Sequence, residues 1–142
     1  MDTNLSVLDE INKGCSMGLE AVDMVLKKVE EHDFRDLLIH FHDDYIELSD
    51  SIIDLYHEYT DEEIHKVNTA EKLMAWYGIM KDTILDDSVS KLAELLINGT
   101  VMGVIEGRKI LNHKKMDKKV HSFCEKFIKM QEKYIEKLKV YL

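Results

Sequence analysis

Residues 34–59 read FRDLLIHFHDDYIELSDSIIDLYHEY, and their large apolar side chains recur at alternating steps of three and four. This spacing places the side chains on one stripe of an α-helix, as in the seam of a helical bundle. A helix of this length is a rod of roughly 40 Å. The stripe consists of Phe34, Leu38, Phe41, Tyr45, Leu48, Ile52, Leu55 and Tyr59.

The same alternation occurs at both ends of the chain. It runs from Leu8 to Val29, where a charged turn over residues 30–33 follows, and again from Val120 to Tyr141. Both segments are therefore predicted to be bundle helices. The expected N-caps of the long helices are Thr3 or Asn4, Asp33, the run Asp86-Asp87-Ser88, and Asp117.

A third long helix is expected over residues 89–112, which are apolar around most of the circumference, so this helix should be the most buried. A shorter amphipathic helix is predicted at about 69–85, within the long connection that precedes the third long helix. The chain has no proline and six glycines, too few for a sheet protein with many tight turns. Residues 1–142 are thus expected to form a single all-α domain.

Composition excludes several functional classes. The net charge is −9, which disfavours nucleic-acid binding. No apolar stretch reaches membrane-spanning length, and two cysteines cannot build a disulfide framework. The start, Met1-Asp2-Thr3-Asn4, lacks the pattern of a signal peptide. We therefore expect a cytoplasmic protein with reduced thiols and no membrane partner.

Two short motifs occur twice in the same order. The pattern G-x-x-M-G stands at residues 14–18 and again at 99–103, and Tyr-Ile-Glu stands at 45–47 and 134–136. The first motif falls on the first and third long helices, and the second on the other two. We interpret this as a weak repeat of a helix pair, which implies a pseudo-two-fold bundle.

The glycines of these helices recur at steps of four, so they share a face. Glycine inside a helix costs about 1 kcal/mol relative to alanine, so a packing reason is expected. We predict that the first and third long helices pack together through these faces; the alternative is that the glycines leave room for a ligand. The residues are Gly14, Gly18, Gly99, Gly103 and Gly107.

Charge is divided along the chain. Residues 30–64 hold thirteen acidic residues and one arginine, a net −12, whereas residues 107–142 hold eleven basic and four acidic residues, a net +7. The second and fourth long helices would suit each other as antiparallel neighbours within one chain. The alternative is a homodimer that pairs the two faces between chains.

The run from Ala93 to Lys109, AELLINGTVMGVIEGRK, resembles an uncharacterised bacterial family of ferritin-like helical proteins. Gly14 to Ala21 and the segment around Trp76 are similar to the same family. The resemblance implies a ferritin-like four-helix bundle, with a long crossover that carries the extra short helix. It implies no established activity.

A ferritin-like di-iron site needs four inward carboxylates and two Glu-x-x-His motifs. The chain has a single such motif, Glu62 to His65, in the crossover. Only Glu106 falls on the predicted inner face, as a possible interior polar site. We therefore expect no metal centre and no cofactor.

Other groups of residues are weaker candidates for a metal or redox site. His40, Asp44 and Glu47 share a helix face and are candidates for a surface metal, although a solvated acidic face is the simpler interpretation. Cys15 and Cys124 fall on seam positions and are expected to be buried thiols rather than a redox pair. His113 is expected to complement the helix dipole at a helix C-terminus. Trp76, Tyr77 and Met80 are expected to cover the bundle.

No catalytic apparatus is visible. The first hypothesis is a non-enzymatic structural or interaction protein. The second is a binding protein for a small apolar or metal ligand in the bundle interior, centred on Glu106 and the glycine faces. A metal-dependent oxidase or storage protein is disfavoured by the ligand count.

Overall fold

A computed structural model describes residues 2–65, 75 and 88–142, which form four long α-helices and contain no strand. The helices are α1 (Thr3–Leu26), α2 (His32–Tyr59), α4 (Val89–His113) and α5 (Lys118–Lys139). The prediction of an all-α chain with four long helices is confirmed. The short helix expected at about 69–85, and with it Trp76, Tyr77 and Met80, lies outside the described residues.

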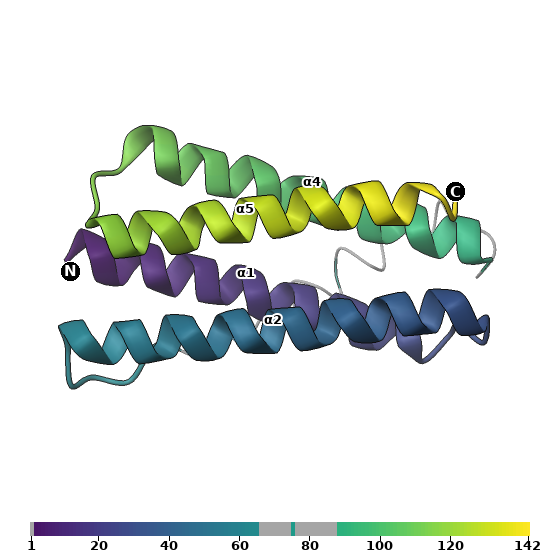
Figure 1. The fold of residues 1–142 in the computed structure, drawn as a ribbon, viewed down its shortest axis with the longest axis horizontal. Helices are drawn as coiled ribbons and strands as arrows, with labels where there is room; N and C mark the ends of the chain where they lie inside the picture. Colours follow the sequence, from purple (N-terminus) through teal and green to yellow (C-terminus); the bar gives the residue numbers. More distant parts are fainter. Residues whose placement is uncertain (1, 66–74, 76–87) are drawn as a thin grey trace.

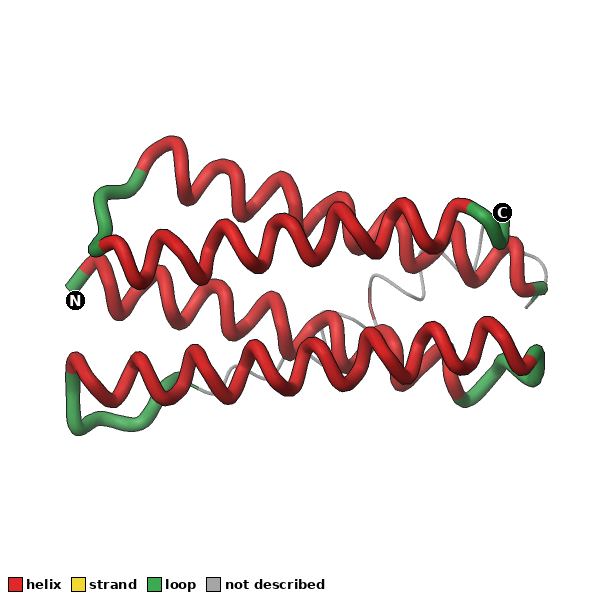
Figure 2. The backbone as a smooth tube through the Cα atoms, in the orientation of Figure 1, coloured by secondary structure: helices red, strands yellow, loops and turns green. Residues whose placement is uncertain are grey.

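The four helices form two antiparallel hairpins, α1 with α2 and α4 with α5, stacked into one bundle (Figure 1). Because α1 and α5 also run side by side in the same direction, the order of directions is up, down, down, up (Figure 2). The chain leaves α2 at one end of the bundle and enters α4 at the other.

The helix starts differ slightly from the predicted caps. Asp2, not Thr3 or Asn4, caps α1 by accepting a bond from the Asn4 amide at 2.7 Å. Glu31, not Asp33, caps α2, because its longer side chain reaches the amides of both Asp33 and Phe34. Ser88 caps α4 as predicted.

Asp117 precedes α5 as expected, yet its side chain makes no capping bond. Its carboxylate instead accepts a hydrogen bond from the Tyr59 hydroxyl at 2.7 Å. The Asp117 amide donates to the Asn4 side chain at 2.8 Å. Asp117 thereby ties the start of α5 to the end of α2 and to the start of α1.

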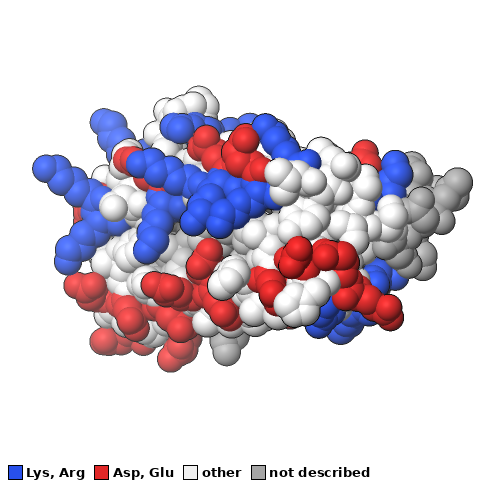
Figure 3. Space-filling view, turned by 45° about the vertical axis from the view of Figure 1, so that its right-hand side comes forward, with Lys and Arg blue, Asp and Glu red and all other residues white. Residues whose placement is uncertain are grey.

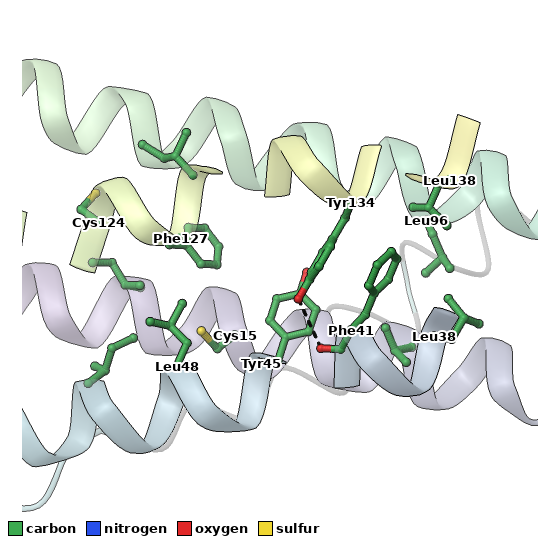
Figure 4. Packing of buried hydrophobic residues seen from close by; sticks show 14 of the residues in the cluster. Cys15, Leu38, Phe41, Tyr45, Leu48, Leu96, Cys124, Phe127, Tyr134 and Leu138 are labelled. Atoms are coloured by element: carbon green, nitrogen blue, oxygen red, sulfur yellow. Dashed lines mark hydrogen bonds between the residues drawn. The ribbon is translucent and has the colours of Figure 1, made fainter. Parts of the chain in front are cut away.

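The predicted stripe of α2 is buried from Phe34 to Leu55, and α2 packs mainly against α1 and to a lesser extent against α5. Figure 4 shows this core, in which side chains from all four helices interdigitate. The α1 stripe is buried as well, although α1 ends at Leu26, and Val29 is buried from the turn that follows. Arg35 stabilises this turn by donating to the carbonyl oxygens of Leu26 and Val29 at 2.6 and 2.8 Å.

The expectation that residues 89–112 form the most buried helix is wrong. Val101, Met102 and Ile105 of α4 are 39%, 52% and 47% exposed. α4 contacts mainly α5 and to a lesser extent α1, which leaves these three side chains on an outward face of the helix. None of the four described helices combines the length and the apolar composition that crossing a bilayer requires.

Candidate ligand-binding groove between α1 and α4

An apolar cavity of about 420 Å³ lies between α1 and α4, with side chains of α2 and α5 as its floor. It extends along the helices, from Glu10 to Val22 on α1, a span of about 18 Å at the rise of an α-helix. All five glycines singled out from the sequence line it: Gly14, Gly18, Gly99, Gly103 and Gly107. We call this cavity the groove.

The two copies of G-x-x-M-G therefore form opposite walls of one groove. Gly14, Met17 and Gly18 line it from α1, and Met102 and Gly103 line it from α4. Since α1 and α4 run in opposite directions, the repeat is arranged with the two-fold character that the sequence suggests.

The glycines do contact neighbouring helices, but mainly through side chains of α2 and α5. A Cβ atom on Gly18 would overlap the Tyr45 ring of α2. A Cβ on Gly14 would lie 2.7 Å from the Phe127 ring of α5. The first and third long helices contact each other as predicted, but the atoms nearest to these glycines belong to side chains of α2 and α5.

The floor of the groove is an aromatic cluster. The rings of Phe41 and Tyr134 stack with centroids 3.8 Å apart, and Tyr45 meets Tyr134 edge to face at 5.4 Å. Figure 4 shows Tyr45 of α2 and Tyr134 of α5 pointing toward each other across the bundle. The second repeated motif, Tyr-Ile-Glu, thus contributes both of its tyrosines to the same site as the glycine motif.

The hydroxyl groups around the groove are all engaged. The Tyr45 hydroxyl donates to Gln131 Oε1 at 3.0 Å, and the Tyr134 hydroxyl donates to Asp44 Oδ2 at 3.0 Å. The Thr100 hydroxyl donates to the Leu96 carbonyl at 2.6 Å.

Gln131 is the exception among these polar groups. Its side chain lines the groove and is 2% exposed, yet its Nε2 atom has no hydrogen-bond partner. An unpaired amide N–H in an apolar interior costs about 1–3 kcal/mol. Gln131 therefore carries a buried donor that no described protein group satisfies.

Burial keeps the thiol and phenol groups near the groove protonated. It raises the pKa of the Cys15 thiol to about 12 and that of the Cys124 thiol to about 11. Burial likewise raises the pKa of Tyr45 and Tyr134 above the usual range. Both cysteines are free and buried, as the sequence predicts. Thiols with such pKa values are poor nucleophiles at neutral pH.

The rim of the groove is charged. Glu10 and Lys13 line it from α1 and Glu106 lines it from α4. The expectation of an interior site at Glu106 is wrong, because its side chain is 72% exposed and lies 3.8 Å from the Lys109 ammonium. Gly107, one residue on, takes the buried position instead.

The surface metal candidates do not converge. Within residues 2–65, 75 and 88–142, no group of three histidine, cysteine, aspartate or glutamate side chains is arranged to hold a metal ion. His40 and Glu47 are exposed, and Asp44 accepts the bond from Tyr134. His65 of the lone Glu-x-x-His motif lies with its Nδ1 atom 2.8 Å from Asp9 Oδ2.

Acidic and basic side chains gather on different sides of the molecule, with the acidic side chains over α2 and the basic ones over α4 and α5 (Figure 3). α2 and α5 are nevertheless neighbours within one chain, joined by the Tyr59–Asp117 bond and by Lys119, which lies 3.6 Å from Glu58. The intramolecular arrangement considered for these two helices is the one observed.

Comparisons with protein-family models, with curated proteins and with solved structures found no match to this chain. What the molecule does must therefore be inferred from the groove itself.

Proposed function

We propose that this protein is a non-enzymatic binding protein, and that its ligand is a small, mainly apolar molecule held in the groove between α1 and α4. The observation that carries the proposal is the cavity of about 420 Å³, which lies against the buried core of the bundle. Natural ligand sites typically measure about 300–1,000 Å³ and combine apolar walls with a few polar groups. The groove has both features.

The use of glycine supports a binding role. Five glycines line the groove, three of them with aromatic or branched side chains directly below, at Gly14, Gly18 and Gly107. Each interior glycine costs about 1 kcal/mol of helix stability relative to alanine. Alanine at Gly103 would fit, since its Cβ atom would lie 3.4 Å from the nearest Gln131 atom. Glycine at position 103 is therefore smaller than the packing requires, and it keeps the α4 wall of the groove open.

The chemistry of the lining supports binding rather than catalysis. The hydroxyls of Tyr45, Tyr134 and Thr100 in the lining are engaged in hydrogen bonds, and the two buried thiols, which stand outside the lining, are protonated at neutral pH. No described group in the groove combines a nucleophile with a base, the pairing that covalent catalysis requires.

The ferritin-like resemblance fits this proposal. The order up, down, down, up is that of a bundle with one long crossover connection, as in ferritin-like folds. In such bundles, ligand sites are built in the core from side chains on facing helices. We propose a ferritin-like bundle whose core serves an organic ligand.

The experiment is a titration of the full chain with Nile red, a neutral apolar dye that fluoresces in water-free sites. We expect saturable binding with one dye per chain. Gly103→Leu and Ala21→Leu add side chains to opposite walls and should weaken binding at least tenfold. Val101→Leu, on the exposed outer face of α4, is the matched control and should leave binding unchanged.

Circular dichroism establishes that each variant remains helical before its affinity is compared. The proposal is overturned if the wild-type chain shows no saturable dye binding. It is also overturned if both groove variants are folded and bind the dye as tightly as the wild type.

Self-association is the second candidate function, favoured by the separation of charge over the surface (Figure 3). The proposed homodimer would pair the acidic face of residues 30–64 with the basic face of residues 107–142. Light scattering at micromolar concentration tests it. A dimer that forms at about 0.05 M salt, where screening is weak, and dissociates at about 0.5 M salt, where screening is strong, supports the pairing. A monomer at low salt excludes it.

A further inference from the structure

We infer that the ligand of the groove is a single-chain amphiphile with a zwitterionic head group. Its alkyl chain lies along the floor of the groove, and its head group lies at the end that holds Glu10 and Lys13. The inference rests on the proposed binding function and names the chemical class of the ligand.

The groove is long and narrow. Its volume of about 420 Å³ is spread over about 18 Å of helix length, which gives a mean cross-section of about 23 Å². One extended alkyl chain fills a channel of this width, whereas two chains side by side do not fit. An alkyl chain also gains affinity in proportion to the apolar surface that it buries. The dimensions therefore favour a ligand with one chain.

The charged side chains of the lining stand at one end of the groove. Lys13 of α1 and Glu106 of α4 are each followed by a glycine, Gly14 and Gly107. A Cβ atom at either glycine would contact the same Phe127 ring, at 2.7 Å from Gly14 and at 3.8 Å from Gly107. Lys13 and Glu106 are therefore at the same end, since α1 and α4 run antiparallel.

The other end of the groove is apolar. Phe41 of α2, Leu96 of α4 and Leu138 of α5 line it, and Figure 4 shows these three side chains together, well away from Phe127. The Thr100 hydroxyl, toward this end, is already bonded to the Leu96 carbonyl. A ligand that fills the groove therefore meets charge and water at one end and hydrocarbon at the other, which is the order of groups in an amphiphile.

The charges at the rim are balanced in sign. Glu10 and Lys13 stand three residues apart on α1, and on α4 the Glu106 carboxylate lies 3.8 Å from the Lys109 ammonium. A zwitterionic head group can pair its cation with a carboxylate and its anion with an ammonium, whereas a head group of one sign meets repulsion as well as attraction. Exposed ion pairs are individually weak, so the head group sets the direction of binding and the chain supplies most of the affinity.

The direction of the chain is tested with octylphosphocholine and dodecylphosphocholine, titrated into the full chain by calorimetry below their critical micelle concentrations. Ala21 lines the groove about 12 Å along α1 from Lys13, beyond the reach of an octyl chain but within that of a dodecyl chain. We expect Ala21→Leu to weaken the dodecyl probe at least about tenfold and the octyl probe less than about twofold. Equal weakening of both probes overturns the proposed direction.

The head group is tested with probes of one chain length. On the wild-type chain, dodecylphosphocholine should bind more tightly than dodecanoate or dodecyltrimethylammonium, and a tighter complex with either of these overturns the zwitterionic assignment. Lys13→Gln should weaken dodecylphosphocholine about threefold and leave dodecanol unchanged. Lys129→Gln, exposed on α5 and outside the lining, is the matched control and should change neither.

The outcomes separate this inference from the binding function on which it rests. If the wild-type chain binds Nile red saturably but neither alkylphosphocholine, the inference is overturned and the binding function stands. If it binds neither the dye nor an alkylphosphocholine, the binding function fails as well. The comparison of head groups on the wild-type chain needs no variant, so it decides the inference even if Ala21→Leu does not fold.

Discussion

The hydroxyl of Tyr45 donates a hydrogen bond of 3.0 Å to Gln131 Oε1, and this bond joins α2 to α5 under the groove. The two residues stand 86 positions apart in the chain and belong to different helical hairpins. The bond is buried, so it contributes to the way in which the hairpins fit together.

Replacing Tyr45 with phenylalanine removes this bond and leaves Gln131 Oε1 unpaired in the core. We expect Tyr45→Phe to lower the free energy of unfolding by about 1–2 kcal/mol, measured by urea denaturation. Tyr59→Phe is the matched control, because its bond to Asp117 is exposed, and it should cost less than about 0.5 kcal/mol. Equal effects of the two substitutions would show that the buried bond does not form.

Alanine substitutions at two glycines should change stability in opposite directions. Gly18→Ala forces a Cβ atom into the Tyr45 ring, so we expect a loss of about 1–3 kcal/mol. Gly103→Ala meets only Gln131 atoms at 3.4–3.5 Å and gains helix propensity, so it should be neutral or stabilise by up to about 1 kcal/mol. Thermal denaturation of both variants is the measurement. A stable Gly18→Ala protein would mean that Tyr45 does not pack against α1.

The spacing of apolar residues predicted the helices because each stripe must be buried whatever its partner. It did not predict how far apart the hairpins stand, since periodicity carries no information about the distance between helices. The glycines were recognised as unusual, but the sequence could not show whether a backbone or side chains from α2 and α5 would face them.

The spacing of apolar residues also failed to predict the burial of two polar residues, Glu106 and Gln131. Glu106 and Gly107 follow Gly103 by three and four residues, so both could continue the glycine face of α4. Because each residue turns the helix by about 100°, only Gly107 is buried and Glu106 reaches the rim. The burial of Gln131 was not predicted, because the apolar stripe from Val120 to Tyr141 was expected to pass through the neighbouring Met130. Its position four residues after Phe127 and three before Tyr134 was the available signal. It is buried because α5 contacts all three other helices, which widens its apolar face.

The two cysteines should resist modification while the protein is folded. Burial raises the pKa of Cys15 to about 12 and of Cys124 to about 11, so almost no thiolate is present at pH 8. We expect Ellman's reagent to react at least about a hundredfold more slowly with native than with urea-unfolded protein. An added cysteine at the exposed position Ser122 serves as an internal control and should react at once. Fast reaction of two native thiols would contradict the burial of Cys15 and Cys124.

The same pKa shifts predict loss of stability in alkali. In the unfolded chain both thiols ionise near the ordinary cysteine pKa of 9.0, whereas in the folded chain burial raises their pKa values to about 12 and 11. The unfolded state therefore binds fewer protons above pH 9, and stability must fall as the pH rises. The expected slope is roughly 1 kcal/mol per pH unit for each thiol, beginning near pH 9.

Urea denaturation at about pH 7, 8, 9 and 10 measures this slope, because these values lie on both sides of the onset expected from the thiol pKa values. Cys15→Ala should be less stable than the wild type at neutral pH, because it leaves a small cavity, and should lose stability less steeply above pH 9. Since Tyr45 and Tyr134 also have raised pKa values, a residual slope should persist near and above pH 10 even in this variant. A wild-type protein whose stability is constant up to pH 10 would show that the thiols are open to solvent.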